Sequence, residues 1–110
     1  MTENELVMAA VLRARNVGKK AALATVVGVT GSAYRREGAK MLVDEEENRV
    51  GMISGGCLEN DVAEIAKSVI ESGTPIVKTY DLDEDLIWGL GLGCPGQVQI
   101  YIEPLLLEQK

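Results

Sequence analysis

The segment Ser54–Glu59 combines residue types that can do chemistry at the predicted start of a helix. Gly55 and Gly56 lead into Cys57, where an amphipathic helical pattern begins. A helix N-terminus carries unpaired N–H groups and about half a positive charge, which favours a bound anion or a thiolate. This field lowers the pKa of a cysteine, whereas acidic residues in the first turn oppose it. The segment therefore predicts an anion site beside a thiolate. The alternative is that Cys57 is a small buried apolar side chain.

A second cysteine, Cys94, lies between Gly93 and Pro95 in a glycine-rich stretch. The stretch contains a literal G-x-G-x-x-G over residues 91–96, the spacing of a dinucleotide-binding loop. That motif must follow a strand and open a helix. Here a proline interrupts it and a strand pattern follows, so we reject the dinucleotide interpretation. Two interpretations stay open for Cys94: a second thiol at the same site, or an ordinary loop residue.

Two adjacent arginines, Arg35 and Arg36, lie in a third loop between Gly31 and Gly38. Arginine is suited to bidentate binding of phosphate or carboxylate. A surface pair that balances nearby acidic residues explains them equally well. The glycine and lysine spacing of this loop does not match a phosphate-binding Walker A sequence.

Composition excludes several classes of function. The 110 residues contain no histidine, which excludes Ser-His-Asp, Cys-His and His-metal chemistry. Eleven basic and 17 acidic residues give a net charge of −6, the wrong sign for general binding to nucleic acid or an anionic membrane. Two cysteines are too few for a disulfide scaffold, and the acidic start lacks the basic region of a signal peptide. We therefore expect a cytoplasmic protein without a membrane segment.

The elements that must position these loops follow from hydrophobic patterns. The patterns predict helices over residues 5–16 and 57–72, and strands over residues 21–28, 40–44, 49–53, 76–81 and 97–102. The acidic turn at residues 44–48 joins two strands, and we expect it to be a solvated turn rather than a metal site. This order predicts an α+β fold with a mixed β-sheet and two main helices, in a single domain over residues 1–110.

Taken together, the motifs resemble the N-terminal domain of the XdhC/CoxI family, from about Ala21 to Leu105. The resemblance is carried by Gly31-Ser32, Arg35, Gly38-Ala39-Lys40-Met41, Gly55-Gly56-Cys57-Leu58-Glu59, Tyr80-Asp81-Leu82 and Trp88-Gly89-Leu90-Gly91-Leu92-Gly93-Cys94. That family matures molybdenum hydroxylases such as xanthine dehydrogenase and carbon monoxide dehydrogenase. Its members are thought to bind the molybdenum cofactor, protect it while a cysteine desulfurase adds its sulfido ligand, and deliver it to the apoenzyme.

The resemblance implies a set of cofactor-binding residues and places each cysteine in one of its motifs. The cofactor-binding set is Gly31, Ser32, Arg35, Gly55, Gly56, Cys57, Gly91 and Gly93, with Cys94 in the same loop as the last two. Three features depart from the family pattern. Ser54 and Pro95 stand where glycines are common, and many relatives continue into a Rossmann-type domain, which we expect a separate chain to supply here.

The leading hypothesis is a carrier of molybdenum cofactor rather than an enzyme. The phosphate of molybdopterin suits glycine N–H groups and arginine, and its soft dithiolene-bound metal suits a thiolate such as Cys57. The resemblance implies as partners a molybdenum hydroxylase apoenzyme and a cysteine desulfurase, and we also expect a homo-oligomer. Two alternatives stay open: a thiol-dependent redox or sulfur-transfer enzyme that uses Cys57 and Cys94, and a non-catalytic module that docks on a hydroxylase.

Overall fold

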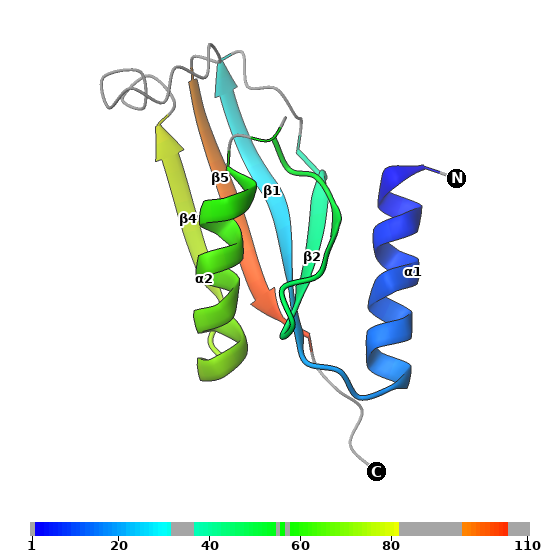
Figure 1. The fold of residues 1–110 in the computed structure, drawn as a ribbon. Coiled ribbons are helices and arrows are strands. Elements are labelled where there is room, and N and C mark those ends of the chain that lie inside the picture. Colours follow the sequence, from blue (N-terminus) through cyan, green and yellow to red (C-terminus); the bar gives the residue numbers. More distant parts are fainter. Residues whose placement is uncertain (1, 32–36, 55, 57, 82–95, 106–110) are drawn as a thin grey trace.

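The computed structural model describes residues 2–31, 37–54, 56, 58–81 and 96–105 (Figure 1). The elements in chain order are α1 (Glu3–Asn16), β1 (Ala21–Gly31), β2 (Lys40–Asp44), β3 (Arg49–Gly51), α2 (Glu59–Ser72), β4 (Ile76–Asp81) and β5 (Gly96–Pro104). These confirm the predicted α+β class, both helices and all the predicted strands. No helix in the described part of the chain is long and apolar enough to cross a membrane.

The strands form one sheet in the order β3-β2-β1-β5-β4. All four pairings between the described strands are antiparallel, so the expectation of a mixed sheet was wrong. A helix between β3 and β4 favours parallel strands, and these two strands do run in the same direction. They are not neighbours, however, because β2, β1 and β5 lie between them. Strand β5 pairs with both β1 and β4, and this long-range insertion removes any parallel contact.

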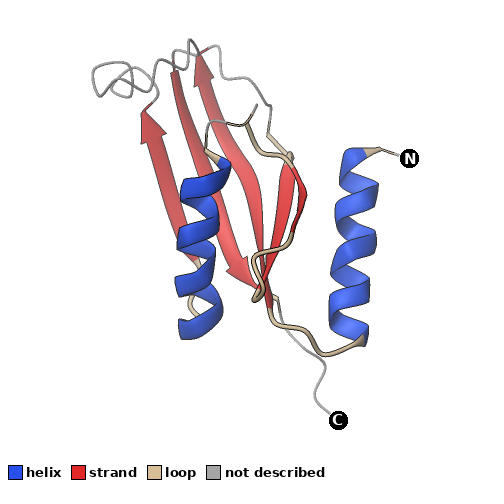
Figure 2. Ribbon diagram, in the orientation of Figure 1, coloured by secondary structure: helices blue, strands red, loops and turns tan. Residues whose placement is uncertain are grey.

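The two helices pack on opposite faces of the sheet (Figure 2). Alternate residues of a strand point to opposite faces, and here Ala22 and Ala24 belong to the core under α2, whereas Ala21 belongs to a second core under α1. The larger core lies between α2 and strands β1 and β5. Helix α1 packs mainly on β2, β3 and the start of β1, so no helix among the described residues covers the same face of β5, β4 and the end of β1.

Local signals explain where each helix begins and ends. Helix α1 begins two residues before the predicted start, because Thr2 and Glu5 form a reciprocal cap: Glu5 N donates to Thr2 Oγ1 over 3.1 Å, and Thr2 N donates to the Glu5 carboxylate over 3.0 Å. Helix α2 ends as predicted at Gly73, whose φ of 71° is left-handed and whose N–H donates to Val69 O over 2.9 Å.

The acidic turn between β2 and β3 is closed by its own hydrogen bonds. One oxygen of Asp44 accepts from Glu46 N over 2.8 Å and from Asn48 N over 3.0 Å. Lys19 forms ion pairs with Asp44 and Glu46. Among the residues that the structure describes, no group of three or more carboxylate or thiol side chains is arranged to hold a metal ion. Residues 45–48 are exposed, which agrees with the prediction of a solvated turn.

Candidate functional site

The loops that carry the predicted site residues all leave the sheet from one end. Strand β1 finishes there at Gly31, which pairs with Gly96 at the start of β5, and β4 finishes at Asp81, which pairs with Gln97. Strand β3 also finishes there, next to the start of β2. Figure 1 shows the N-terminus of α2 at this same end. We call it the loop end. Segments 32–36, 52–58 and 82–95 all connect to it.

The structure describes two of the predicted site residues at the loop end. Gly31 is the last residue of β1, and Gly56 lies just before α2. The others lie outside the described residues: Ser32, Arg35, Gly55, Cys57, Gly91, Gly93 and Cys94. The fold therefore shows that their segments start and finish at a common end, which is the arrangement that a shared binding site requires.

Ser54 and Glu59 join the two sides of the segment that contains Cys57. The Glu59 carboxylate accepts hydrogen bonds from Ile53 N over 2.9 Å, from Ser54 N over 2.8 Å and from the Ser54 hydroxyl. The Ser54 hydroxyl oxygen in turn accepts from Leu58 N over 3.0 Å. Ser54 is buried, with 6% of its surface exposed. We call this set of hydrogen bonds the Ser54–Glu59 clamp, and it closes the chain around residues 55–57.

The clamp changes the electrostatics expected at the start of α2. Partial burial raises the pKa of Glu59, but the hydrogen bonds from Ser54 and Ile53 lower it by more, so the pKa lies below its ordinary value of 4.5. The side chain is therefore a carboxylate at neutral pH. It lies at the positive end of the helix and occupies the N–H groups of Ile53 and Ser54. These two N–H groups are therefore not available to a bound phosphate.

The next two residues of α2 attach the helix to the sheet. Asn60 accepts a hydrogen bond from Arg49 Nη1 in β3 over 2.8 Å, and Asp61 accepts one from the Tyr80 hydroxyl in β4. Tyr80 is buried, and Lys78 Nζ lies 5.6 Å from the centre of its ring. Three consecutive residues of the first turn thus hold the helix to three different segments. The sequence showed the acidic first turn but gave no sign of these partners.

Gly56 leaves open space beside the clamp. Its φ of 109° is left-handed, which favours glycine, and a Cβ built there would have no neighbour within 4 Å among the described residues. A glycine with open space beside it allows a ligand to approach the backbone closely. The described residues of this segment therefore fit a ligand held at the loop end.

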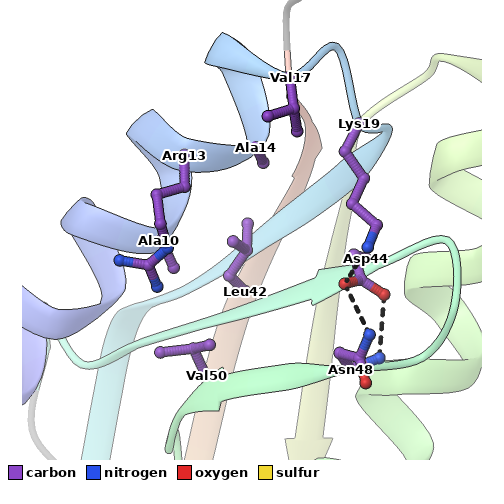
Figure 3. A pocket seen from close by; sticks show the side chains of 9 residues that line it. All are labelled: Ala10, Arg13, Ala14, Val17, Lys19, Leu42, Asp44, Asn48 and Val50. Carbon is purple, nitrogen blue, oxygen red and sulfur yellow. Dashed lines mark hydrogen bonds and ion pairs between the residues drawn. The ribbon is translucent and has the colours of Figure 1, made fainter.

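A separate apolar groove lies between α1 and the β2–β3 hairpin (Figure 3). Ala10, Ala14, Leu42 and Val50 form its floor and sides, and it extends to Asp44 and Asn48 at the hairpin turn. This turn lies at the opposite end of β2 from the loop end. None of the predicted site residues lines the groove, so it is separate from the candidate site.

Comparison with known proteins gives a family match that spans most of these elements. The model of the XdhC and CoxI family matches residues 14–81, which include the Gly31–Lys40 loop, the clamp and the end of β4. The matched residues thus include two of the three segments that connect to the loop end, 32–36 and 52–58.

Individual relatives agree with this match. The chain is 39% identical over 94 residues to a probable xanthine dehydrogenase component of Bacillus subtilis, and 35% identical over 99 residues to the molybdenum cofactor insertion chaperone PaoD of Escherichia coli. The alignments cover 84% of this chain in both cases, but only 28% and 29% of the relatives.

A solved structure agrees as well. A crystal structure described as a xanthine dehydrogenase from Bacillus halodurans superposes with a TM-score of 0.79 at 38% identity, over 93% of this chain and 31% of that one. The chain therefore spans less than a third of the length of the relatives that it matches. The motif set, the fold and the family match lead to one conclusion: the chain belongs to the XdhC and CoxI family.

Proposed function

We propose that this chain binds the molybdenum cofactor and assists its sulfuration and its insertion into a molybdenum hydroxylase of the xanthine dehydrogenase or carbon monoxide dehydrogenase type. The observation that carries the proposal is the convergence of the three candidate segments on the loop end. The family match over residues 14–81 includes two of them, 32–36 and 52–58. The relative PaoD is named as a molybdenum cofactor insertion chaperone, and this supports the proposal that the present chain assists cofactor insertion.

Each part of the proposed site has a chemical task. The Cys57 thiolate contacts the molybdenum or its sulfur, since soft thiolate ligands suit a soft dithiolene-bound metal. Glycine backbone from Gly31, Gly55, Gly56, Gly91 and Gly93 lies close to the pterin and its phosphate. Arg35 and Ser32 supply phosphate donors. Arginine matters more than the sequence alone implied, because Glu59 already occupies two N–H groups before α2.

The proposal also implies partners and a compartment. A hydroxylase apoenzyme receives the cofactor, and a cysteine desulfurase supplies the sulfur. A reduced Cys57 is compatible with the cytoplasm, where thiols stay reduced. A Rossmann-domain chain, a homo-oligomer, a redox or sulfur-transfer role for Cys57 and Cys94, and a cofactor-independent docking module stay predictions from the sequence.

Removal of the Cys57 thiol is expected to weaken cofactor binding. Molybdenum cofactor released anaerobically from a purified molybdenum enzyme should bind the wild type and bind Cys57→Ala at least about tenfold more weakly, a difference of about 1.4 kcal/mol. Equilibrium binding followed by the absorbance of the cofactor measures both. Met52→Ala is the matched control, because Met52 is exposed in the same segment and outside the clamp. Absence of binding by the wild type contradicts the proposed function, and equal binding by Cys57→Ala contradicts the role of the thiol.

A further inference from the structure

A polar groove opens at the loop end, on the part of the α1-side face of the sheet that no described helix covers. It is lined by Gly28, Val29, Thr30, Glu37, Gln97 and Gln99. Its cavity volume is about 240 Å³. Sites for drug-sized ligands measure about 300–1,000 Å³, so this groove suits a smaller, flat ring system.

Strand register explains why these side chains meet. Gly28 pairs with Gln99 and Thr30 pairs with Gln97, and paired residues of an antiparallel sheet point to the same face. The pairing shifts by one residue between Val26 and Gly28, which forms a β-bulge at Val27. Gln99 Oε1 lies over Gly28: a Cβ built on Gly28 would be 2.7 Å from it. Gly28 thus forms the floor of the groove, and the two glutamine amides stand along it.

Glu37 is held at the groove by the residue that follows it. Gly38 N donates to Val26 O over 2.8 Å, which fixes the returning chain beside the bulge. Gly38 O accepts from the Asn4 side chain over 2.9 Å, so α1 supports the same turn. The backbone next to Glu37 is therefore held in place by described residues, and the Glu37 side chain lines the groove together with the two glutamines.

The polar groups of the groove define a ligand class. They comprise one carboxylate, two amides and one hydroxyl, and no cationic side chain lines the described groove. An anion such as phosphate is disfavoured there, because Glu37 would repel it. A carboxylate accepts two parallel hydrogen bonds from neighbouring N–H groups, and amides donate and accept at the other edge. The 2-amino-4-oxopyrimidine ring of a pterin presents such adjacent N–H donors, followed by a carbonyl and ring nitrogens that accept.

We propose that this groove binds the 2-amino-4-oxopyrimidine edge of the pterin, with Glu37 accepting from the amino group and the adjacent ring N–H, and Gln97 and Gln99 hydrogen bonding to the rest of the ring. The inference rests on the proposed function and adds a recognition site for the end of the cofactor that is remote from the metal. The Cys57 segment and this groove then take opposite ends of one extended ligand at the loop end.

Nuclear magnetic resonance with free heterocycles tests this directly. Addition of 6-hydroxymethylpterin to the wild-type chain should shift the side-chain amide signals of Gln97 and Gln99 and the backbone signals of Gly28 and Thr30, with a dissociation constant on the order of 1 mM. Lumazine, which carries an oxygen in place of the 2-amino group, should bind at least about fivefold more weakly than 6-hydroxymethylpterin. No saturable shift at these residues, or equal binding of lumazine, overturns the proposal.

Two variants separate recognition from folding. Glu37→Gln removes the bidentate acceptor and should weaken pterin binding at least about fivefold. Gly28→Ala displaces only the flexible end of Gln99, so the chain should still fold while pterin binding falls. Glu103→Gln is the matched control, because Glu103 is also on β5, four residues from Gln99 and outside the groove. Equal pterin binding by Glu37→Gln and Glu103→Gln overturns the role of the carboxylate.

Two further measurements are needed. The first distinguishes a pterin from a guanine nucleotide as the ligand of the groove, and the second distinguishes failure of the groove assignment from failure of the proposed function. Guanosine presents the same pyrimidine edge, and binding tighter than that of 6-hydroxymethylpterin would assign the groove to a guanine nucleotide and overturn its assignment to pterin. Intact cofactor distinguishes the proposals: if Glu37→Gln binds it like the wild type while Cys57→Ala does not, the groove assignment fails and the proposed function stands. If the wild type binds no cofactor, the proposed function fails.

Discussion

Replacement of Gly51 with alanine is expected to lower the free energy of unfolding by at least about 3 kcal/mol. Gly51 has a φ of 95°, a left-handed conformation that is strained for alanine. A Cβ there would lie 2.3 Å from Lys40 O in the neighbouring strand and 2.4 Å from a methyl group of the fully buried Val7. A backbone carbonyl cannot rotate away, so β2, β3 or α1 must move. Urea unfolding followed by circular dichroism measures the loss.

Gly73→Ala separates crowding from backbone strain. Gly73 also has a left-handed φ, 71°, but a Cβ there would have no neighbour within 4 Å. The free energy of unfolding of this variant should fall by only about 1–2 kcal/mol, which is the cost of the left-handed conformation for alanine. Equal losses in the two variants would contradict the claim that β2, β3 and α1 are tightly packed at Gly51.

The second large effect is expected from Glu59→Ala, which removes the acceptor of the clamp. The substitution leaves Ile53 N, Ser54 N and the Ser54 hydroxyl without their acceptor, and Ser54 is buried. Loss of hydrogen bonds to a charged group typically costs about 1.5–3 kcal/mol, so we expect a stability loss of about 2–3 kcal/mol. Glu64→Ala is the control, because its side chain is 70% exposed and pairs with Lys67 on the surface. Similar losses in both variants would show that the clamp contributes little.

The contribution of Glu59 should also depend on pH in a defined direction. Its pKa in the folded state lies below the ordinary value of 4.5, so the folded state favours the ionised form. The stabilisation is therefore fully present above the pKa of the unfolded state and is lost as the pH falls through the folded-state pKa. The stability difference between wild type and Glu59→Gln should be largest near pH 7 and should shrink below about pH 4.5. A difference that stays constant from pH 7 to pH 3 would contradict this account.

The sequence was most informative where local pattern determines structure. The apolar stripe of α2 and the glycine after it predicted that helix well, and the alternation of Val98, Ile100 and Ile102 predicted β5. It was least informative about pairing across long separations. Insertion of β5 between β1 and β4 depends on contacts between residues about 70 positions apart, and no local signal records it. The extension of β1 to Gly31 has the same cause, since the bulged pairing with β5 continues to its end.

The candidate site shows the same division between local and long-range information. Sequence spacing alone indicated that Ser54–Glu59 enters a helix, and it suggested an open anion site there. The structure shows that Glu59 itself occupies N–H groups before the helix, because the chain folds back onto Ser54. The polar groove at Gly28 and Gln99 was not predicted, because its residues come from two strands and a turn that only the sheet brings together.

The most direct test of cofactor binding is to measure what the protein contains when it is isolated from a host that makes molybdenum cofactor. The wild type and Cys57→Ser would be purified without oxygen, with molybdenum measured by mass spectrometry and pterin measured by the fluorescence of its oxidised product. We expect molybdenum and pterin in a ratio of about one to one in the wild type, and a clear loss of molybdenum in Cys57→Ser. Wild-type protein with no more molybdenum and pterin than an unrelated protein from the same host would contradict it.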